Sequence, residues 1–169
     1  GTTTVPDGLL CRCSRCKKPI LVQEVRDAYY ICPKCGGYFK VRAYERIRRV
    51  ADEGTFQESD RELVGENPLG FEGYEEKLAA ERLKTRMKEA IVTGTGSIDG
   101  IPAALGVMDS RFMMASMGWA VGEKLTRLIE KATAENLPLI LFTCSGGARM
   151  QEGVLSLMQM AKVSAAVRQ

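Results

Sequence analysis

The sequence predicts an α/β domain preceded by a small module that binds a metal ion through cysteines. Two Cys-x-x-Cys pairs, Cys13/Cys16 and Cys32/Cys35, lie within the first forty residues. From residue 90 onward, two apolar runs of strand length precede a helical pattern, and a third such run precedes another. Strands that alternate with helices in this way are typical of α/β proteins.

Composition supports this fold class and excludes several others. The chain has 169 residues, of which 45% are hydrophobic and 27% charged, as in soluble globular proteins. That length accommodates one medium-sized domain and a small module. No apolar run approaches the ~20 residues that cross a membrane, and no basic-then-apolar leader opens the sequence. We therefore expect no membrane partner and a cytoplasmic or equivalent reducing compartment.

The absence of histidine excludes much common enzyme chemistry. A Ser-His-Asp triad, a Cys-His pair and a His-ligated metal cannot be built from this chain alone. If the chain takes part in catalysis, it must rely on other bases, on backbone dipoles, on a metal held by other ligands, or on a base supplied by the substrate or a partner.

The predicted module spans residues 9–40 and contains five of the six cysteines. Short apolar stretches at 20–22 and 29–31 favour a small ribbon of strands. Fifteen residues separate the two Cys-x-x-Cys pairs, a spacing typical of four-sulfur zinc sites, and Gly36 suits the turn after Cys35. Disulfides are disfavoured in a reducing compartment, whereas a one-iron site remains an alternative. Cys11 has the wrong spacing for a ligand and is expected to be a free surface thiol.

A predicted helical connection follows over residues 41–89. Apolar residues at helical spacing predict a helix over 41–52 that ends at Gly54. Residues 55–70, which contain Asn67-Pro68, predict an irregular segment, and a charged, helix-prone stretch runs from 72 to about 89.

The main domain is predicted over residues 90–169. Residues 90–98 and 102–108 read as two strands joined by the hairpin turn Asp99-Gly100. The Gly94-x-Gly96 pair lies in the first strand, and its spacing excludes a dinucleotide-binding loop. A helix of about four turns over 121–132, a strand over 139–142 and a final helix follow.

The strongest candidate for a catalytic or binding site is the turn Cys144-Ser-Gly-Gly-Ala148, between the last strand and the last helix. Gly146 and Gly147 let a ligand approach the backbone, and a helix that starts near Ala148 would offer unpaired N–H groups to an anion or an oxyanion. A tight turn without any ligand is the alternative. Ser145 is expected to cap the helix and Cys144 to be buried, whereas Arg149 fits an anion or a partner better than the helix dipole.

A second turn precedes the helix over 121–132. Met117 and Gly118 either line a ligand pocket or allow close packing, with Trp119 and Gly122 following. Methionines are frequent near both turns and either surround an apolar cleft or fill the core; they are Met113, Met114, Met117, Met150, Met158 and Met160.

These motifs strongly resemble the β subunit of bacterial and plastid acetyl-CoA carboxylase carboxyltransferase. Four stretches carry the resemblance, in order and over nearly the whole chain: the cysteine quartet, Met108-Asp-Ser-Arg-Phe112, Ser116-Met-Gly118 with Gly122-Glu-Lys124, and Ser145-Gly-Gly-Ala-Arg-Met-Gln-Glu152 followed by 157–162. The chain departs from the family pattern at Ala115, Trp119 and Cys144, and the family's later Thr-Thr-Gly-Gly segment is missing. The resemblance therefore implies that the chain holds the first half of the domain.

The resemblance also implies a fold and an activity. It implies a crotonase-like domain over 90–169 behind a zinc ribbon, and an α subunit as partner in an α₂β₂ assembly. The expected reaction transfers a carboxyl group from carboxybiotin on the biotin carboxyl carrier protein to acetyl-CoA, giving malonyl-CoA for fatty-acid biosynthesis. Gly146 and Gly147 would stabilise the thioester enolate, and Ser145, Ala148, Arg149, Met117 and Gly118 would line the substrate site.

The charge distribution leaves a different function open. Residues 1–50 contain 11 basic and four acidic residues, a net charge of +7, whereas residues 51–169 carry −4. A basic head suits an anionic partner such as nucleic acid, an acidic protein surface or the phosphates of coenzyme A. Tyr29, Tyr30, Tyr38 and Phe39 could stack on bases. A carboxyltransferase or decarboxylase for another acyl-CoA is a further alternative.

Overall fold

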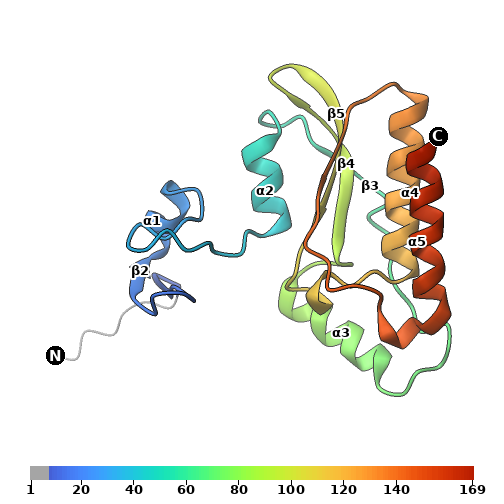
Figure 1. Ribbon diagram of the computed structural model, residues 1–169, viewed down its shortest axis with the longest axis horizontal. Helices are drawn as coiled ribbons and strands as arrows, with labels where there is room; N and C mark the ends of the chain where they lie inside the picture. Colours follow the sequence, from blue (N-terminus) through green and yellow to red (C-terminus); the bar gives the residue numbers. More distant parts are fainter. Residues whose placement is uncertain (1–7) are drawn as a thin grey trace. The chain divides into compact units, whose positions relative to one another are not determined.

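The computed structural model describes residues 8–169, which form two compact units (Figure 1). The first unit ends at Val41, and the second runs from Arg42 to Gln169. Within residues 8–169 no helix is both long and apolar enough to cross a membrane.

The first unit is a small ribbon whose core contains two of the four paired cysteines. Strands β1 (Leu10–Arg12) and β2 (Pro19–Leu21) pair antiparallel, and the short helix α1 (Val22–Asp27) follows β2 directly. The predicted second strand at 29–31 is reduced to one bridge between Ile31 and Tyr38, because Tyr29 and Tyr30 have positive φ. Buried residues form its core, namely Cys13, Ile20, Val25 and Cys32.

The second unit is built on a four-stranded sheet in the order β3-β4-β5-β6. Strand β4 (Ile91–Ile98) pairs antiparallel with both β3 (Gln57–Ser59) and β5 (Ile101–Met108), whereas β6 (Leu139–Phe142) runs parallel to β5. The predicted hairpin turn is confirmed, since Asp99 and Gly100 both have positive φ, as a two-residue turn of this kind requires. Gly94 lies in β4, where a Cβ atom would stand 2.3 Å from the Gln57 carbonyl oxygen.

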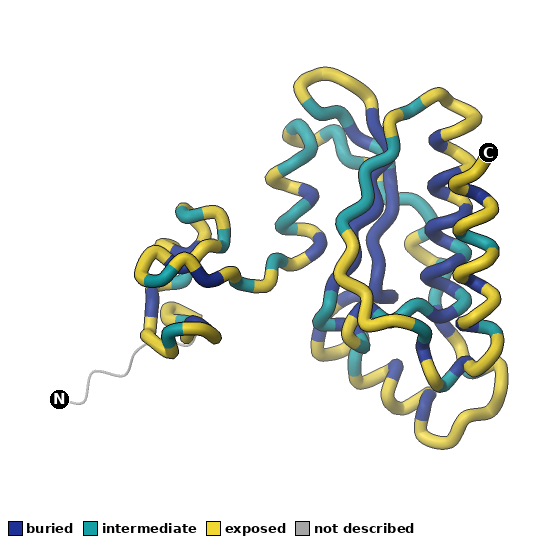
Figure 2. The backbone as a smooth tube through the Cα atoms, in the orientation of Figure 1, coloured by how far each residue is buried: buried dark blue, intermediate teal, exposed yellow. Residues whose placement is uncertain are grey.

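Helices cover both faces of this sheet. Helix α2 (Ala43–Val50) packs on one face and α4 (Trp119–Ala134) on the other, and α5 (Gly153–Arg168) packs against α4 (Figure 1). Helix α3 (Tyr74–Thr85) lies at one end of the sheet. Because both faces are covered, β5 is buried along most of its length, and Figure 2 shows the dark core that it forms with β4.

Two expectations for the connecting segments need correction. The segment at 55–70 is not wholly irregular, because β3 lies within it and pairs with β4. The last helix begins at Gly153 and not near Ala148, with one turn of 3-10 helix (Met150–Glu152) preceding it. The glycine pair therefore does not form the N-terminus of that helix.

Candidate metal centre and candidate active site

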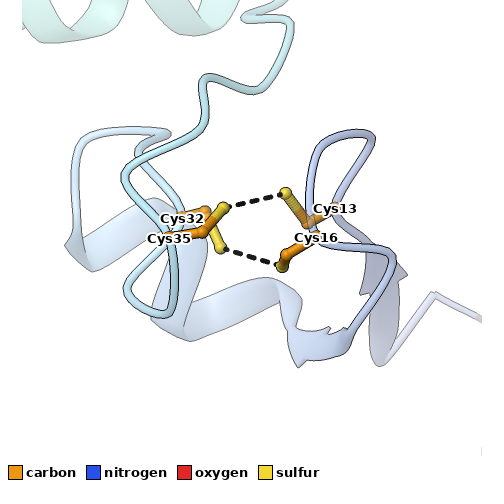
Figure 3. Close-up of side chains that lie close together, drawn as sticks. All are labelled: Cys13, Cys16, Cys32 and Cys35. Atoms are coloured by element: carbon orange, nitrogen blue, oxygen red, sulfur yellow. Dashed lines mark hydrogen bonds between the residues drawn. The ribbon is translucent and has the colours of Figure 1, made fainter.

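The four paired cysteines converge in the first unit. Their sulfur atoms all lie within 4.8 Å of one another, with Cys13 Sγ 3.7 Å from Cys35 Sγ and Cys16 Sγ 3.9 Å from Cys32 Sγ (Figure 3). Tetrahedral Zn–S bonds of about 2.3 Å place the sulfurs about 3.8 Å apart. The donor set and its spacing thus fit a closed four-thiolate metal site.

Two equivalent turns build this site. The residue after each Cys-x-x-Cys pair has positive φ, +60° at Lys17 and +69° at Gly36, and donates its N–H to the carbonyl of the first cysteine at 2.9 Å. The N–H of Cys16, donating to the Cys13 sulfur, outweighs the opposing effect of burial and lowers the pKa of that thiol to about 6. The lowered pKa favours the thiolate form of Cys13, whereas, against the Gly37 N–H, burial and the neighbouring cysteines raise the pKa of Cys35 to about 11.

Cys11 lies outside the quartet, as expected. Its thiol points to the Ile20 carbonyl oxygen at 3.6 Å, and burial raises its pKa. Cys11 forms no disulfide, as expected, but it is half-buried and not at the surface.

The glycine turn of the second unit is exposed, and its two N–H groups differ. Gly146 donates its N–H to the Met114 carbonyl oxygen at 2.9 Å, so this donor is engaged within the fold. Gly147 has φ of +107° and donates to the exposed Ser145 hydroxyl at 3.1 Å. Ser145 therefore closes a local turn instead of capping a helix. Of the two glycine N–H groups, that of Gly147 is the one that can turn to a ligand without breaking a backbone hydrogen bond.

The two predicted turns lie side by side. Met117 donates its N–H to the Gly147 carbonyl at 2.8 Å, and Arg149 returns one to the Met117 carbonyl at 3.0 Å. The segment before Met117 is strained, because Met113, Met114 and Ala115 all have φ between +44° and +55°, a region that non-glycine residues rarely adopt. A strained backbone at this place supports a functional site.

A cleft of about 500 Å³ opens beside the glycine turn. Met113, Met114 and Met150 line it, so three of the six methionines gather there as one alternative predicted. The α3 residues Lys77, Glu81 and Lys84 contribute charged side chains, as does Arg111. The remaining lining residues are Ser116, Gly146, Ala148, Arg149 and Gln151. Lys84 pairs with Glu81 at 3.7 Å and Arg111 with Asp109 at 2.7 Å, and Lys77 adds a further cation. The excess of positive charge suits an anionic ligand.

Arg149 does not face a ligand in the way that the sequence suggested, but is paired with Glu89 inside the fold. Its guanidinium is fully buried and forms a bidentate ion pair with Glu89, with N···O distances of 2.7 and 3.2 Å. It also donates to the Ser116 hydroxyl, the Ser116 carbonyl and the Tyr74 hydroxyl. A guanidinium has five N–H donors, and these five contacts use them all. The neighbouring Glu89 carboxylate raises the pKa of Arg149 despite the opposing effect of burial.

Gly118 serves close packing around a second buried carboxylate. The Glu152 side chain accepts the Trp119 N–H at 2.5 Å and the Tyr74 hydroxyl at 2.6 Å. A Cβ atom on Gly118 would stand 2.4 Å from Glu152 Oε1, so only glycine fits there. Gly122 is similar, since a Cβ atom there would meet Gln159 of α5 at 2.3 Å.

Three buried residues of the site were not predicted from the sequence, and the expectation for Cys144 was wrong. Tyr74, Glu89 and Glu152 are buried beside the two turns, but charged and polar residues are usually assigned to the surface. Glu152 ends the glycine-turn motif, which was the one available signal. Cys144 is exposed and not buried as expected, because the turn that carries it leaves the sheet at the end of β6.

Known proteins resemble this chain in sequence over nearly its whole length. The model of the carboxyl transferase domain family matches residues 40–169. An acetyl-coenzyme A carboxylase carboxyl transferase subunit beta from Carboxydothermus hydrogenoformans is 56% identical over 158 residues, covering 94% of this chain and 56% of the relative. A fused subunits beta/alpha protein from Natranaerobius thermophilus is 55% identical over 96% of this chain and 27% of its own length. The chain thus spans about half the length of the beta-subunit relative.

Solved structures extend the similarity to the fold. Transcarboxylase 12S, with methylmalonyl-coenzyme A and methylmalonic acid bound, superposes with a TM-score of 0.66 at 28% identity, covering 75% of this chain and 23% of the other. The Pseudomonas malonate decarboxylase MdcD-MdcE heterodimer superposes with a TM-score of 0.56 at 25% identity, covering 76% and 46%.

Proposed function

The chain belongs to the carboxyl transferase domain family, and we propose that it is part of an acetyl-CoA carboxylase carboxyltransferase β subunit. Its mixed α/β architecture is the crotonase-like fold of the carboxyltransferases, as expected. The proposed reaction transfers a carboxyl group from carboxybiotin to acetyl-CoA and gives malonyl-CoA for fatty-acid biosynthesis. The observation that carries the proposal is the Gly147 N–H, which lies on an exposed turn beside a cationic cleft.

In this proposal the chain binds the thioester and stabilises developing charge. The Gly147 N–H exchanges the Ser145 hydroxyl for the thioester oxygen and holds it as the enolate forms. Lys77, together with the ion-paired Lys84 and Arg111, leaves the cleft an excess of positive charge that attracts the anionic part of the substrate. Carboxybiotin supplies the carboxyl group, and its ureido nitrogen supplies the base that a chain without histidine does not provide.

The proposal also names partners, a metal and a compartment. The partners are an α subunit in an α₂β₂ assembly and the biotin carboxyl carrier protein. Zinc held by Cys13, Cys16, Cys32 and Cys35 would stabilise the ribbon without catalytic work, because four thiolates leave no open position. No disulfide joins any of the six cysteines within residues 8–169, which suits the reducing cytoplasm or, in a plant or alga, the plastid stroma.

The test is a transfer assay on the natural polypeptide that contains this chain, assembled with its α subunit. Acetyl-CoA and carboxybiotin should give malonyl-CoA, and propionyl-CoA and free malonate serve as competing substrates. Rapid transfer to acetyl-CoA supports the proposal. Preference for a longer acyl-CoA would change the substrate, and decarboxylation of malonate without transfer would change the reaction.

A second role for the ribbon has support of its own. Tyr29 and Tyr38 are 77% and 81% exposed in a unit rich in lysine and arginine, an arrangement that suits stacking on single-stranded nucleic acid. Binding of a labelled RNA oligonucleotide should weaken steeply between 50 and 200 mM salt, as it does for proteins that contact several phosphates. If no binding is detected at the lower salt concentration, this role is excluded.

A further inference from the structure

We infer that four buried side chains, Tyr74, Glu89, Arg149 and Glu152, act as positioning residues that hold the two turns of the candidate active site against each other. We call them the buried ionic cluster. The inference rests on the proposed function for its kinetic consequence, whereas the structural coupling that it predicts can be measured without any activity.

The buried ionic cluster is anchored at both turns through Arg149. Arg149 immediately follows the glycine turn, and its guanidinium reaches across to the second turn, where it donates to both the hydroxyl and the carbonyl of Ser116. The backbone hydrogen bonds between Met117 and Gly147 and between Arg149 and Met117 run alongside this side-chain link. The two turns are thus joined by their backbones and by one arginine.

Arg149 is itself held in place by Glu89. Glu89 holds it from the opposite side in a bidentate ion pair, and the Glu89 carboxylate accepts the N–H groups of Gly65 and Ala90 as well. A bidentate pair fixes the plane of the guanidinium, which a single point charge cannot do. Glu89 immediately precedes Ala90 and β4, and its carboxylate accepts the Ala90 N–H. The ion pair therefore fixes the two turns relative to the sheet.

Tyr74 and Glu152 link the cluster to α3 and α4. Tyr74, the first residue of α3, donates its hydroxyl to Glu152 and accepts from Arg149 at 3.3 Å. Glu152 in turn holds the N–H of Trp119, the first residue of α4. Tyr74 therefore connects Arg149, which follows the glycine turn, to Glu152. Glu152 in turn fixes the start of α4, which follows the second turn.

Arg149 is the one member of the cluster among the cleft-lining residues, and its side-chain donors are all engaged within the fold. Arg149 and Glu152 side chains are 0% exposed, as is Glu89, and every guanidinium N–H already has an acceptor. Such a buried network is rigid when it is fully satisfied, and loss of one member leaves polar groups without partners. Its effect on catalysis must therefore pass through the geometry of the turns and not through direct contact.

The test replaces Tyr74 by phenylalanine in the natural polypeptide assembled with its α subunit. Tyr74→Phe removes one hydroxyl and keeps the ring that packs in the core. Tyr44→Phe is the matched control, because the Tyr44 hydroxyl also bonds a glutamate, Glu58, but on the outside of α2. Glu152→Gln provides a second variant if Tyr74→Phe does not fold.

Deuterium uptake gives the structural readout. Tyr74→Phe should speed exchange in peptides covering residues 111–118 and 144–152 together, whereas Tyr44→Phe should leave both unchanged. If one turn loosens without the other, the inference is overturned. This result stands whether or not the protein transfers carboxyl groups, so failure of the proposed function is recognised separately by an inactive wild type.

Kinetics give the second readout. In the active complex, Tyr74→Phe should lower kcat about tenfold and leave the KM for acetyl-CoA within about twofold, because binding groups stay in place. Combined with Gly147→Ala, its effect should fall well short of the product of the two single effects, since both act on one turn. Fully multiplicative effects, or an unchanged kcat, would show that the cluster is merely structural.

Discussion

Gly146 donates its backbone N–H to the Met114 carbonyl oxygen, whereas the next residue, Gly147, has only the exposed Ser145 hydroxyl as an acceptor. The glycine pair is therefore asymmetric. Gly146 joins the two turns. A larger residue would be crowded there, because its Cβ atom would stand 3.1 Å from the Met114 oxygen. Gly147 is the residue whose N–H remains available to a substrate.

The first prediction tests this assignment with Gly147→Ala. We expect a fall in kcat on the order of 100-fold, which is typical of losing one oxyanion donor, because alanine at a φ of +107° would force the turn to move. Gly100→Ala is the matched control. Gly100 also has positive φ and open space around its Cα, but lies in the β4–β5 hairpin. Both changes should cost about 1–2 kcal/mol of stability, whereas only the first should slow transfer.

The second prediction concerns the metal. Cys32→Ser should lower the bound zinc far below one ion per chain, since three thiolates hold it much less tightly than four. Cys11→Ser should leave the metal content unchanged, because Cys11 lies outside the quartet. Metal released on thiol oxidation, measured with a chromogenic chelator, checks both variants. Equal loss in the two would contradict the assigned ligand set.

The third prediction concerns the two turns of the ribbon. Lys17 holds the left-handed conformation that Gly36 holds in the equivalent turn. Lys17→Gly should therefore stabilise the metal-bound ribbon by about 0.5–1 kcal/mol, since the relief of steric strain exceeds the entropy that glycine adds to the unfolded chain. The same change at the adjacent exposed Lys18, which has no positive φ, should not stabilise it. Chelator competition measures both.

The fourth prediction concerns pH and Asp109. This carboxylate accepts hydrogen bonds from the Ala43 N–H and from the backbone and side chain of Arg111. Burial alone would raise its pKa, but the Arg111 guanidinium and these N–H groups lower it below the ordinary value. A lowered folded-state pKa contributes stability that is present above the unfolded pKa of about 3.9 and is lost as the pH falls through the folded value.

Asp109→Asn should therefore cost about 2 kcal/mol at pH 7, and the difference from wild type should shrink at pH 3. Urea unfolding followed by fluorescence measures it in the second unit alone, because Trp119 is the only tryptophan. A difference that stays constant between the two pH values would mean that the charge of Asp109 contributes nothing.

Local signals explain what the sequence predicted well. The β4–β5 hairpin follows from two apolar runs around Asp99-Gly100, and the end of β6 follows from an apolar run that stops at Thr143. The cysteine quartet is equally local, because the spacing of the ligands within each pair defines the site. In each case residues close in sequence determine the structure.

The features that the sequence did not predict depend on distant contacts. β3 is a strand of three polar residues that forms only because β4 lies beside it. Glu89 and Arg149 are 60 residues apart, and nothing near either one indicates that both charges are buried together. The helix after the glycine turn starts late because Glu152 is drawn inward to Trp119 and Tyr74, which leaves its own segment in a 3-10 turn.

The left-handed run at Met113, Met114 and Ala115 has a consequence for how this protein adapts. Each such residue costs roughly 1–2 kcal/mol relative to glycine in the same conformation. Glycine at these positions would relieve this strain, yet it would also loosen the backbone that presents the Met114 carbonyl to the Gly146 N–H. Lineages that move to hotter habitats should therefore gain stability elsewhere in the chain, because at these three positions heat resistance and turnover are opposed.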